Sequence, residues 1–346
     1  MIEAYKINKK DDISNFKIFE NRINITVLIT SISQREITIE TAYYYSDICT
    51  EVVLVDEEEP CISEVEIKNL SNKGIKYIPY SDGSDLSLTS TYDKRLIAAN
   101  HASNKYLVHS NHDERYTYKG LKACIEELEN DEKLTFCVGQ CIAVRKNKLG
   151  IHYTRSYENL YEYLNMNEVD DRLYYHAQKY APIGHYGVWR RDEYINASKK
   201  TISIHNKVPS TTMMEEVIFE LAADLMGNSK AVPELFWIRN RINPPSGNSL
   251  DKGQHIFSTI KSKLLILFID LDVDIEIIFN NFRNSHFAFI KPSFSSKFLL
   301  FIKRAARIFI KKKQVNDIYT LLNNSEIKYE ENDLSNVLKS MKSHIK

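Results

Sequence analysis

Residues 25–30 read Ile-Thr-Val-Leu-Ile-Thr, a short run of β-branched and apolar side chains that would be buried on both faces of a strand. Such a run is typical of a strand in a parallel sheet, because helices cover both faces of that kind of sheet. A polar loop follows at 31–35, and a helix-like pattern covers 36–47. Strand, polar loop and helix in this order predict the first unit of an α/β fold.

The same alternation of strand and helix continues through residue 144. Further strands are expected at 51–56, 74–79, 106–109 and 135–144, and further helices at 92–103 and 118–130. Short repeats of this kind predict a mostly parallel sheet flanked by helices. Ligands of such sheets bind where the strands end, so the loops after Thr30, Asp56 and His109 should line one crevice.

The composition is that of an ordinary globular protein of 346 residues, with 43% hydrophobic and 27% charged residues. Its 46 Lys and Arg balance 46 Asp and Glu, so the net charge gives no reason to expect a nucleic-acid partner. The five cysteines are an odd number without zinc-ribbon spacing. We expect them to be reduced packing residues of a cytosolic protein.

The sequence also argues against a leader and against a membrane span. Residues 1–12 are polar and charged, unlike a secretory leader. The longest apolar candidate, 264–269, is cut short by Asp270, Asp272 and Asp274, far below the ~18 apolar residues of a spanning helix. We therefore expect a cytoplasmic protein.

A break at 243–247, Asn-Pro-Pro-Ser-Gly, indicates a domain boundary. We expect one catalytic domain over 1–245 and a helical C-terminal region over 246–346. Within the latter, 291–313 holds eight Lys or Arg and no acid, with Phe and Ile at helical spacing. Such a helix can lie peripherally on an anionic membrane, and packing against the core with a solvated cationic face is the alternative.

Four pieces of the sequence follow one another in a recognisable order. They are a buried strand and Arg-containing loop at 25–35, a strand ending in an acid at 52–56, a helix with Arg and Asn at 95–100, and a strand running into an acidic motif at 106–114. This layout resembles the nucleotide-recognition half of GT-A glycosyltransferases, and more narrowly a divergent bacterial group used in cell-surface polysaccharide assembly. The resemblance covers about 24–242 and is one of layout more than of letters. It implies a GT-A-like α/β fold with a helical C-terminal extension.

The resemblance implies a donor site along the strand ends. Asp56 would bind the base or ribose, and Arg35 and Arg95 would bind the phosphates of a UDP- or CMP-linked sugar. A solvated acid in a charged loop is the alternative for Asp56, and a surface position is the alternative for Arg35. Further donor contacts are expected from Thr30, Ser31, Asn111, His112 and Arg239.

The acidic motif departs from the family pattern, in which Asp-x-Asp or Asp-Asp-Asp holds Mg²⁺ or Mn²⁺. Residues 111–114 read Asn-His-Asp-Glu, so Asp113 is the candidate metal ligand, with Glu114 beside it and His112 as a nitrogen donor. The alternative is a metal-free site in which Arg, Lys, His or Tyr stabilises the leaving phosphate. A CMP-activated acidic sugar would suit that alternative. Asp113 could instead cap the next helix.

Candidate catalytic residues are Glu215, Glu216, His185 and Asp113. In the inverting enzymes of this group an acidic pair supplies the base that takes the proton of the acceptor hydroxyl. Only one of two adjacent acids can face the cleft, and we favour Glu216. His185 is the rival base. Favourable placement of acids at a helix start is the alternative for the Glu pair.

An acceptor platform is predicted at 184–191, where glycines flank His185 and allow a close approach of the backbone to a ligand. Tyr186, Trp189 and Arg190 would bind the sugar through aromatic faces and hydrogen bonds. A buried aromatic cluster is the alternative. Arg239 and Arg241 could share one strand face and grip an anionic donor.

The function predicted is transfer of a sugar from a nucleotide-activated donor to a glycan or lipid-linked acceptor in bacterial surface polysaccharide synthesis. A sugar nucleotidyltransferase is one alternative, but such enzymes usually open with a Gly-rich loop and Lys, and 31–36 has neither. A non-catalytic glycan-binding protein is the other.

Overall fold

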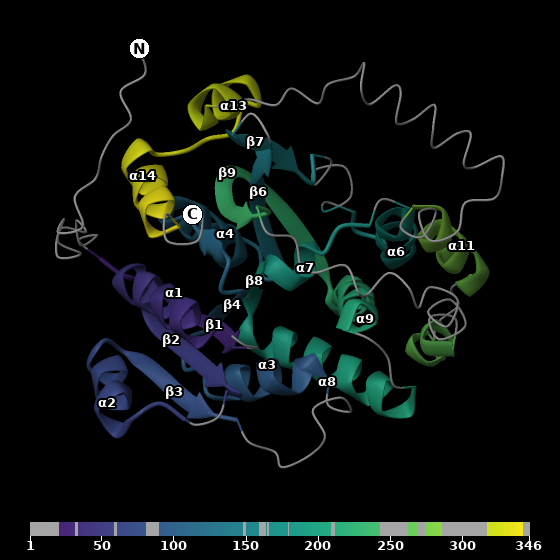
Figure 1. The fold of residues 1–346 in the computed structure, drawn as a ribbon. Coiled ribbons are helices and arrows are strands. Elements are labelled where there is room, and N and C mark those ends of the chain that lie inside the picture. The colour runs from purple at the N-terminus through teal and green to yellow at the C-terminus, as the bar shows by residue number, and fades with distance from the viewer. Residues whose placement is uncertain are drawn as a thin grey trace.

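The computed structural model describes residues 21–31, 34–58, 61–80, 90–147, 150–158, 164, 166–178, 180–208, 212–242, 262–268, 274–285 and 317–341. One nine-stranded sheet runs through the molecule in the order β3-β2-β1-β4-β8-β6-β9-β5, and β7 pairs with β6 outside this path (Figure 1). Helices flank the sheet, and the predicted α/β class is confirmed.

The first half of the sheet is fully parallel. It consists of β1 (Ile23–Ser31), β2 (Cys49–Asp56), β3 (Ile75–Pro79) and β4 (Tyr106–Ser110). The apolar residues of β1, β2 and β4 are buried, as the continuous apolar runs predicted. The register sets Ser31 beside Asp56 and Ile29 beside Ser110, so these strands end at one edge.

The second half mixes directions. It consists of β5 (Glu114–Tyr116), β6 (Leu134–Asn147), β7 (Gly150–Ser156), β8 (Val188–Arg190) and β9 (Asn228–Asn240). β6 and β9 are parallel to each other, while β8 is antiparallel to both β4 and β6. β5 pairs antiparallel with β9 and sets Glu114 opposite Arg239, which joins the segment after β4 to the end of β9.

Eight helices flank the strands of the described part of the sheet domain. They are α1 (Arg35–Ile48), α2 (Glu64–Asn72), α3 (Thr91–Asn100), α4 (Tyr118–Asn130), α6 (Val169–Gln178), α7 (Ile183–Tyr186), α8 (Arg191–Lys207) and α9 (Thr212–Met226). Of these, α2, α3 and α4 begin at a side-chain cap. Ser90 and Asp93 form a capping box at α3, and Thr117 caps α4. α8 packs against α3 and α9, and α4 packs against β9 and β6 (Figure 1).

The described C-terminal pieces are helical, as predicted. They are residues 262–267, α11 (Ile275–Ser285), α13 (Ile318–Asn324) and α14 (Glu331–Ser340). α11 packs on α6, and Asp333 of α14 accepts hydrogen bonds from the amides of Tyr118 and Lys119 at the start of α4. These pieces therefore pack directly on the sheet domain. The predicted boundary at 243–247 and the basic segment 291–313 lie outside the described residues.

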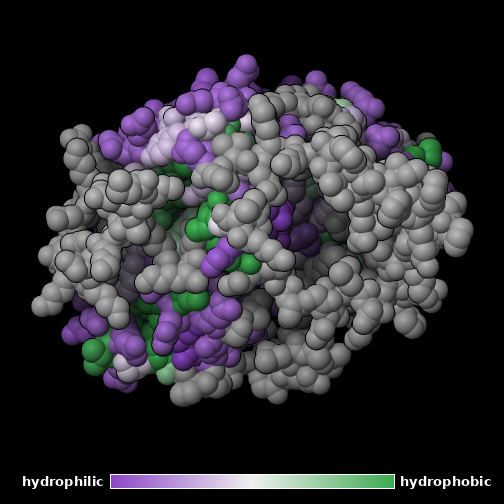
Figure 2. All heavy atoms as spheres, turned by 45° about the horizontal axis from the view of Figure 1, so that its top comes forward, coloured by the Kyte–Doolittle hydropathy of each residue, from purple (hydrophilic) through white to green (hydrophobic). Residues whose placement is uncertain are grey.

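Within the described part of the chain, no helix has both the length and the apolar character needed to cross a membrane. On the face drawn in Figure 2, hydrophilic side chains gather along the upper edge, and hydrophobic ones show in small groups. Four of the five cysteines are buried, in agreement with a packing role. Cys61 is exposed, so that interpretation is wrong for this residue.

Candidate active site

Three of the residues predicted for the donor, Ser31, Arg35 and Asp56, lie together where β1 and β2 end. Asp56 is buried there, and its Oδ2 accepts hydrogen bonds from Arg35 Nε at 2.7 Å and from the Tyr77 hydroxyl at 2.8 Å. Arg35 also donates to the carbonyl of Glu58, and Ser31 donates to the Glu58 carboxylate at 3.1 Å. The structure therefore brings Ser31, Arg35 and Asp56 together, and Asp56 is not a solvated loop acid.

Arg95 of α3 lies beside His185 of α7. Its guanidinium is 4.6 Å from the centre of the Tyr92 ring, and its Nη1 is 2.8 Å from His185 Nδ1. The Tyr92 hydroxyl is 3.0 Å from the same nitrogen. Burial, and then the charge of Arg95, lowers the pKa of His185 well below its usual value. Because the Arg95 guanidinium can only donate, Nδ1 of His185 accepts this hydrogen bond and the ring is neutral with its proton on Nε2.

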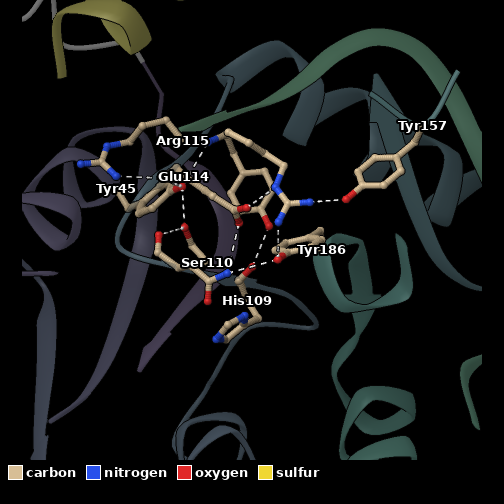
Figure 3. Close-up of polar contacts among 10 residues, drawn as sticks. Tyr45, His109, Ser110, Glu114, Arg115, Tyr157 and Tyr186 are labelled. Atoms are coloured by element: carbon tan, nitrogen blue, oxygen red, sulfur yellow. Dashed lines mark hydrogen bonds and ion pairs between the residues drawn. The ribbon is translucent and has the colours of Figure 1, made fainter. Parts of the chain in front are cut away.

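Glu114 and Arg239 form a buried ion pair, with Nε 2.6 Å from Oε1. The two terminal nitrogens of Arg239 donate to the hydroxyls of Tyr157 and Tyr186, the latter at 2.9 Å. Figure 3 shows Glu114, Tyr157 and Tyr186 converging on this guanidinium. Burial raises the pKa of Glu114 to about 7, against the charge of Arg239, which lowers it. The Asn111 amide reaches Glu114 at 3.4 Å and the Tyr186 hydroxyl at 3.3 Å.

These contacts decide how a divalent cation would fit. Glu114 is the counterion of Arg239, while His112 and Asp113 are half-buried at the turn that follows β4. Across the described ranges, His, Cys, Asp and Glu side chains form no group of three that could hold a metal. The residues of the motif therefore do not fit a cation held by the protein alone, since Mg²⁺ and Mn²⁺ require several oxygen ligands.

The acidic pair of α9 divides into two different environments. Glu215 is buried, and its Oε2 accepts hydrogen bonds from the amide of Thr91 at 2.9 Å and from the hydroxyls of Ser90 and Thr91. Its Oε1 is 2.5 Å from His205 Nδ1. Glu215 therefore anchors the start of α3, where its charge also favours the helix dipole.

Glu216 is half-buried and accepts a hydrogen bond from the Tyr180 hydroxyl at 2.9 Å. Burial raises its pKa, while that hydrogen bond and the charges of Arg239, Arg95 and Arg241 lower it. Glu216 is thus the member of the pair that faces the arginines of the site.

Two predicted acceptor residues lie elsewhere. Trp189 is fully buried, stacks on Phe136 at 4.8 Å and donates its Nε1 to the carbonyl of Gly184. Arg190 pairs with Tyr106, at the opposite end of β4 from His109, and donates to the carbonyl of Leu134. The structure therefore groups Tyr186 with the donor residues and sets Trp189 and Arg190 apart from them.

His109 and Thr30 complete this edge of the sheet. The Thr30 hydroxyl is 3.3 Å from His109 Nε2, and the rings of His109 and His185 meet edge to face at 5.2 Å. Figure 3 shows the His109 ring directed away from Glu114. Within the described residues, His109 Nδ1 and Arg95 Nε are buried without hydrogen-bond partners.

Sequence reasoning missed four residues of this region: Tyr157, His176, Tyr180 and Glu220. Tyr180 stands in the motif that contains His185, and its spacing gave no sign that it would reach Glu216. Glu220 was visible as an acid four residues after Glu216, which places it on the same face of α9. No local signal marks Tyr157.

The mixed α/β fold is similar to that of solved glycosyltransferase structures. The structure of S. aureus TarS 1–349 matches with a TM-score of 0.52 and 14% identity, over 93% of this chain and 91% of that one. A longer S. aureus TarS chain matches with a TM-score of 0.51 and 13% identity, over 93% of this chain and 55% of the TarS chain, so this chain spans about half of it. At this identity the likeness shows the fold alone.

A further structure, S. aureus TarS 1–349 in complex with UDP-GlcNAc, matches with a TM-score of 0.49 and 13% identity, over 93% of this chain and 91% of that chain. No family model and no curated protein matches the sequence.

Proposed function

We propose that this protein is a glycosyltransferase that moves a sugar from a nucleotide-activated donor to a hydroxyl group of a glycan or lipid-linked acceptor. The observation that carries the proposal is Glu216, a half-buried carboxyl of α9 that accepts a hydrogen bond from Tyr180 and lies in the field of Arg95 and Arg239. A general base needs a pKa nearer neutrality than that of a free carboxyl, and burial moves Glu216 in that direction.

The residues take separate roles in this reaction. Asp56 and its partners Arg35 and Tyr77 would contact the nucleoside at the ends of the parallel strands. The Glu216 carboxylate accepts the proton of the acceptor hydroxyl while that oxygen bonds to the anomeric carbon of the sugar. The bond from that carbon to the phosphate oxygen breaks, and its electron pair leaves with the nucleotide.

Arg95 stabilises the negative charge that develops on the leaving nucleotide. Arg95 is 7% exposed, and its Nε has no hydrogen-bond partner among the described residues. A buried guanidinium that contacts a neutral imidazole costs free energy until an anion reaches it. Because Glu114 is already paired with Arg239, we propose that transfer does not need a metal ion.

The metal question has a direct test. Turnover is measured in EDTA and in Mn²⁺, and Mn²⁺ binding is measured by calorimetry with nucleotide present. We expect activity in EDTA within about threefold of that in Mn²⁺. Activity that vanishes in EDTA and returns with Mn²⁺ would show that Asp113 holds a catalytic cation together with the donor phosphates.

The function itself is tested by release of nucleotide from UDP-, GDP-, dTDP- and CMP-linked sugars, with and without candidate acceptors. Glu216→Gln should lower kcat by about 100-fold or more while nucleotide still raises the melting temperature. Glu129→Gln, the same change at an exposed position of α4, is the matched control and should leave kcat unchanged. Full activity in Glu216→Gln would remove this residue as the base.

The acceptor side of the proposal includes peripheral binding to the inner face of a membrane through 291–313. Binding to phosphatidylglycerol vesicles is compared for the wild type and a variant with the eight Lys and Arg of that segment changed to Gln. Reduced binding supports a membrane-bound acceptor, and equal binding supports a packing role for the segment.

A further inference from the structure

One short segment, 180–187, contacts three separate parts of the proposed site. Tyr180 donates to Glu216, the proposed base. His185 receives Arg95 at 2.8 Å. Tyr186 receives hydrogen bonds from Arg239 and Asn111. The geometry of base, arginine and acidic motif therefore depends on how this segment is held.

Glu220 of α9 fixes this segment by hydrogen bonds to its backbone. It is 0% exposed, its Oε2 lies 2.8 Å from the amide of Gly184 and its Oε1 lies 2.7 Å from the amide of His185. Both amides belong to the first turn of α7, where helix geometry leaves them without an intrahelical acceptor. Glu216 and Glu220 are four residues apart on α9. The same helix face therefore carries the proposed base and the carboxyl that binds the backbone of 180–187.

His176 of α6 supports the same segment from its other side. Its Nε2 is 2.8 Å from the carbonyl of Ala181, and its Nδ1 is 2.8 Å from Asp224 Oδ2. Both partners are acceptors, so both ring nitrogens carry protons and the ring is an imidazolium. It lies 3.8 Å from Glu220 and stacks on the Tyr180 ring at 5.7 Å. The imidazolium pairs directly with the buried Asp224 carboxylate, and its charge lowers the pKa of Glu220 against the effect of burial.

We propose that Glu220, with His176 and Asp224, is a positioning unit of the transfer reaction that fixes segment 180–187 so that Tyr180 orients Glu216 and Tyr186 orients Asn111 and Arg239. The inference rests on the proposed function of the site. None of the three acids and bases of the unit needs to touch the substrate. A network that only stabilised the fold would change the melting temperature and leave turnover alone.

The test compares two buried glutamates changed in the same way. Glu220→Gln keeps the shape of the side chain, but its NH₂ group faces one of the two amide donors, so one hydrogen bond is lost. Glu51→Gln is the matched control, because Glu51 is also buried and accepts the amide of Ser103 at 2.8 Å, at the other end of the sheet. Turnover, donor KM and melting temperature are measured for both variants and the wild type.

We expect both variants to melt earlier, and only Glu220→Gln to lose kcat, by about 10-fold or more, at a temperature well below its melting point. Faster hydrogen exchange at 181–187 in Glu220→Gln, and not in Glu51→Gln, should accompany this loss. If Glu220→Gln does not fold, His176→Gln is measured in its place. It keeps a polar side chain but removes the charge and one of the two contacts.

The outcomes separate the two proposals. A wild type without turnover on any donor would remove the proposed function, and the positioning role with it. An active wild type whose Glu220→Gln and His176→Gln variants melt earlier at unchanged kcat would overturn the positioning role alone. Recovery of kcat in Glu220→Asp relative to Glu220→Ala would support it, because the shorter carboxylate can still accept one amide.

Discussion

At the scale of single residues, the buried acid Glu51 of β2 connects neighbouring parts of the parallel sheet through its side chain. It accepts hydrogen bonds from Thr26 at 2.5 Å and from the amide and hydroxyl of Ser103, and it pairs with Lys76. Burial raises its pKa, but the hydrogen bonds from Lys76, Thr26 and Ser103 outweigh burial and hold the value at about 2. The ionised form of Glu51 is therefore stabilised more strongly in the folded state than in the unfolded state.

The depressed pKa fixes the sign of a pH effect. The stabilisation by Glu51 is present above the unfolded pKa of about 4.5 and is lost as pH falls toward 2. We expect Glu51→Gln to lower the free energy of unfolding by about 1–3 kcal/mol at pH 7, because buried donors lose a charged acceptor. Urea unfolding from pH 7 to pH 3 should show this difference shrink with acid. A gap that stays constant would contradict the pKa shift.

His176 gives a second pH prediction, on the alkaline side. Burial lowers its pKa, but the charge and hydrogen bond of Asp224 and the charge of Glu220 raise it to about 9. Burial, in turn, raises the pKa of Glu220 to about 8. The unfolded values are 6.5 for His176 and 4.5 for Glu220. The stabilisation by each protonated group is therefore full below its unfolded pKa and is lost as pH rises through its folded pKa.

The wild type should therefore lose stability as pH rises from about 4.5 to about 9. A double variant, His176→Gln with Glu220→Gln, should be less stable at pH 7 and should show a flatter dependence over that range. Denaturant unfolding at several pH values measures the free energy of unfolding of both proteins. Parallel curves would mean that neither group titrates differently in the folded state.

At the scale of elements, the contact of α4 with β9 depends on a glycine. A Cβ at Gly120 would lie 2.5 Å from the Phe236 Cα and 2.6 Å from the Leu235 carbonyl oxygen, and both are backbone atoms that cannot turn away. Gly120→Ala gains about 1 kcal/mol of helix propensity but overpacks the interface by about 1–3 kcal/mol or more. We expect a net fall in melting temperature, measured by calorimetry, while Lys122→Ala on the exposed face of α4 should change little.

The same elements show which parts of the fold could be predicted. α4 was expected at 118–130 and is Tyr118–Asn130, because Thr117 provides a local cap and the apolar residues recur with helical period. β5 and β8 have three residues each, too few to show a period, and β5 exists because β9 pairs with it. A strand of this kind is a product of tertiary pairing.

In the candidate site, too, some positions carry a local sequence signal and others depend on contacts between distant elements. Asp56 could be predicted, since an acid after a buried strand carries its own local signal. Glu114 was noted only as the acid beside the candidate metal ligand Asp113, and its partner in the structure, Arg239, comes from β9, more than a hundred residues later. Trp189 and Arg190 looked like acceptor groups because aromatic and basic residues serve equally in sugar sites and in cores. Only the topology, which sets β8 between β4 and β6, separates these two uses.

At the scale of the whole molecule, the C-terminal helices belong to the sheet domain. Asp333 is buried and accepts the amides of Tyr118 at 3.0 Å and Lys119 at 2.9 Å, so α14 caps α4. Lys328 exchanges backbone hydrogen bonds with the 233–235 stretch of β9. An end of the chain that provides a helix cap and pairs with a central strand stabilises both elements.

Removal of α13 and α14 should therefore destabilise the sheet domain itself. We expect Asp333→Ala to lower stability by about 0.5–2 kcal/mol, as loss of a cap does, and truncation after residue 316 to lower it further, since β9 also loses its bridge at Lys328. Melting temperatures of the two variants measure this, with Glu331→Ala on exposed α14 surface as control. A truncated protein that melts like the wild type would show the extension to be dispensable. Because truncation would also destabilise the sheet domain, charge substitution within 291–313 tests the proposed membrane binding more directly than deletion does.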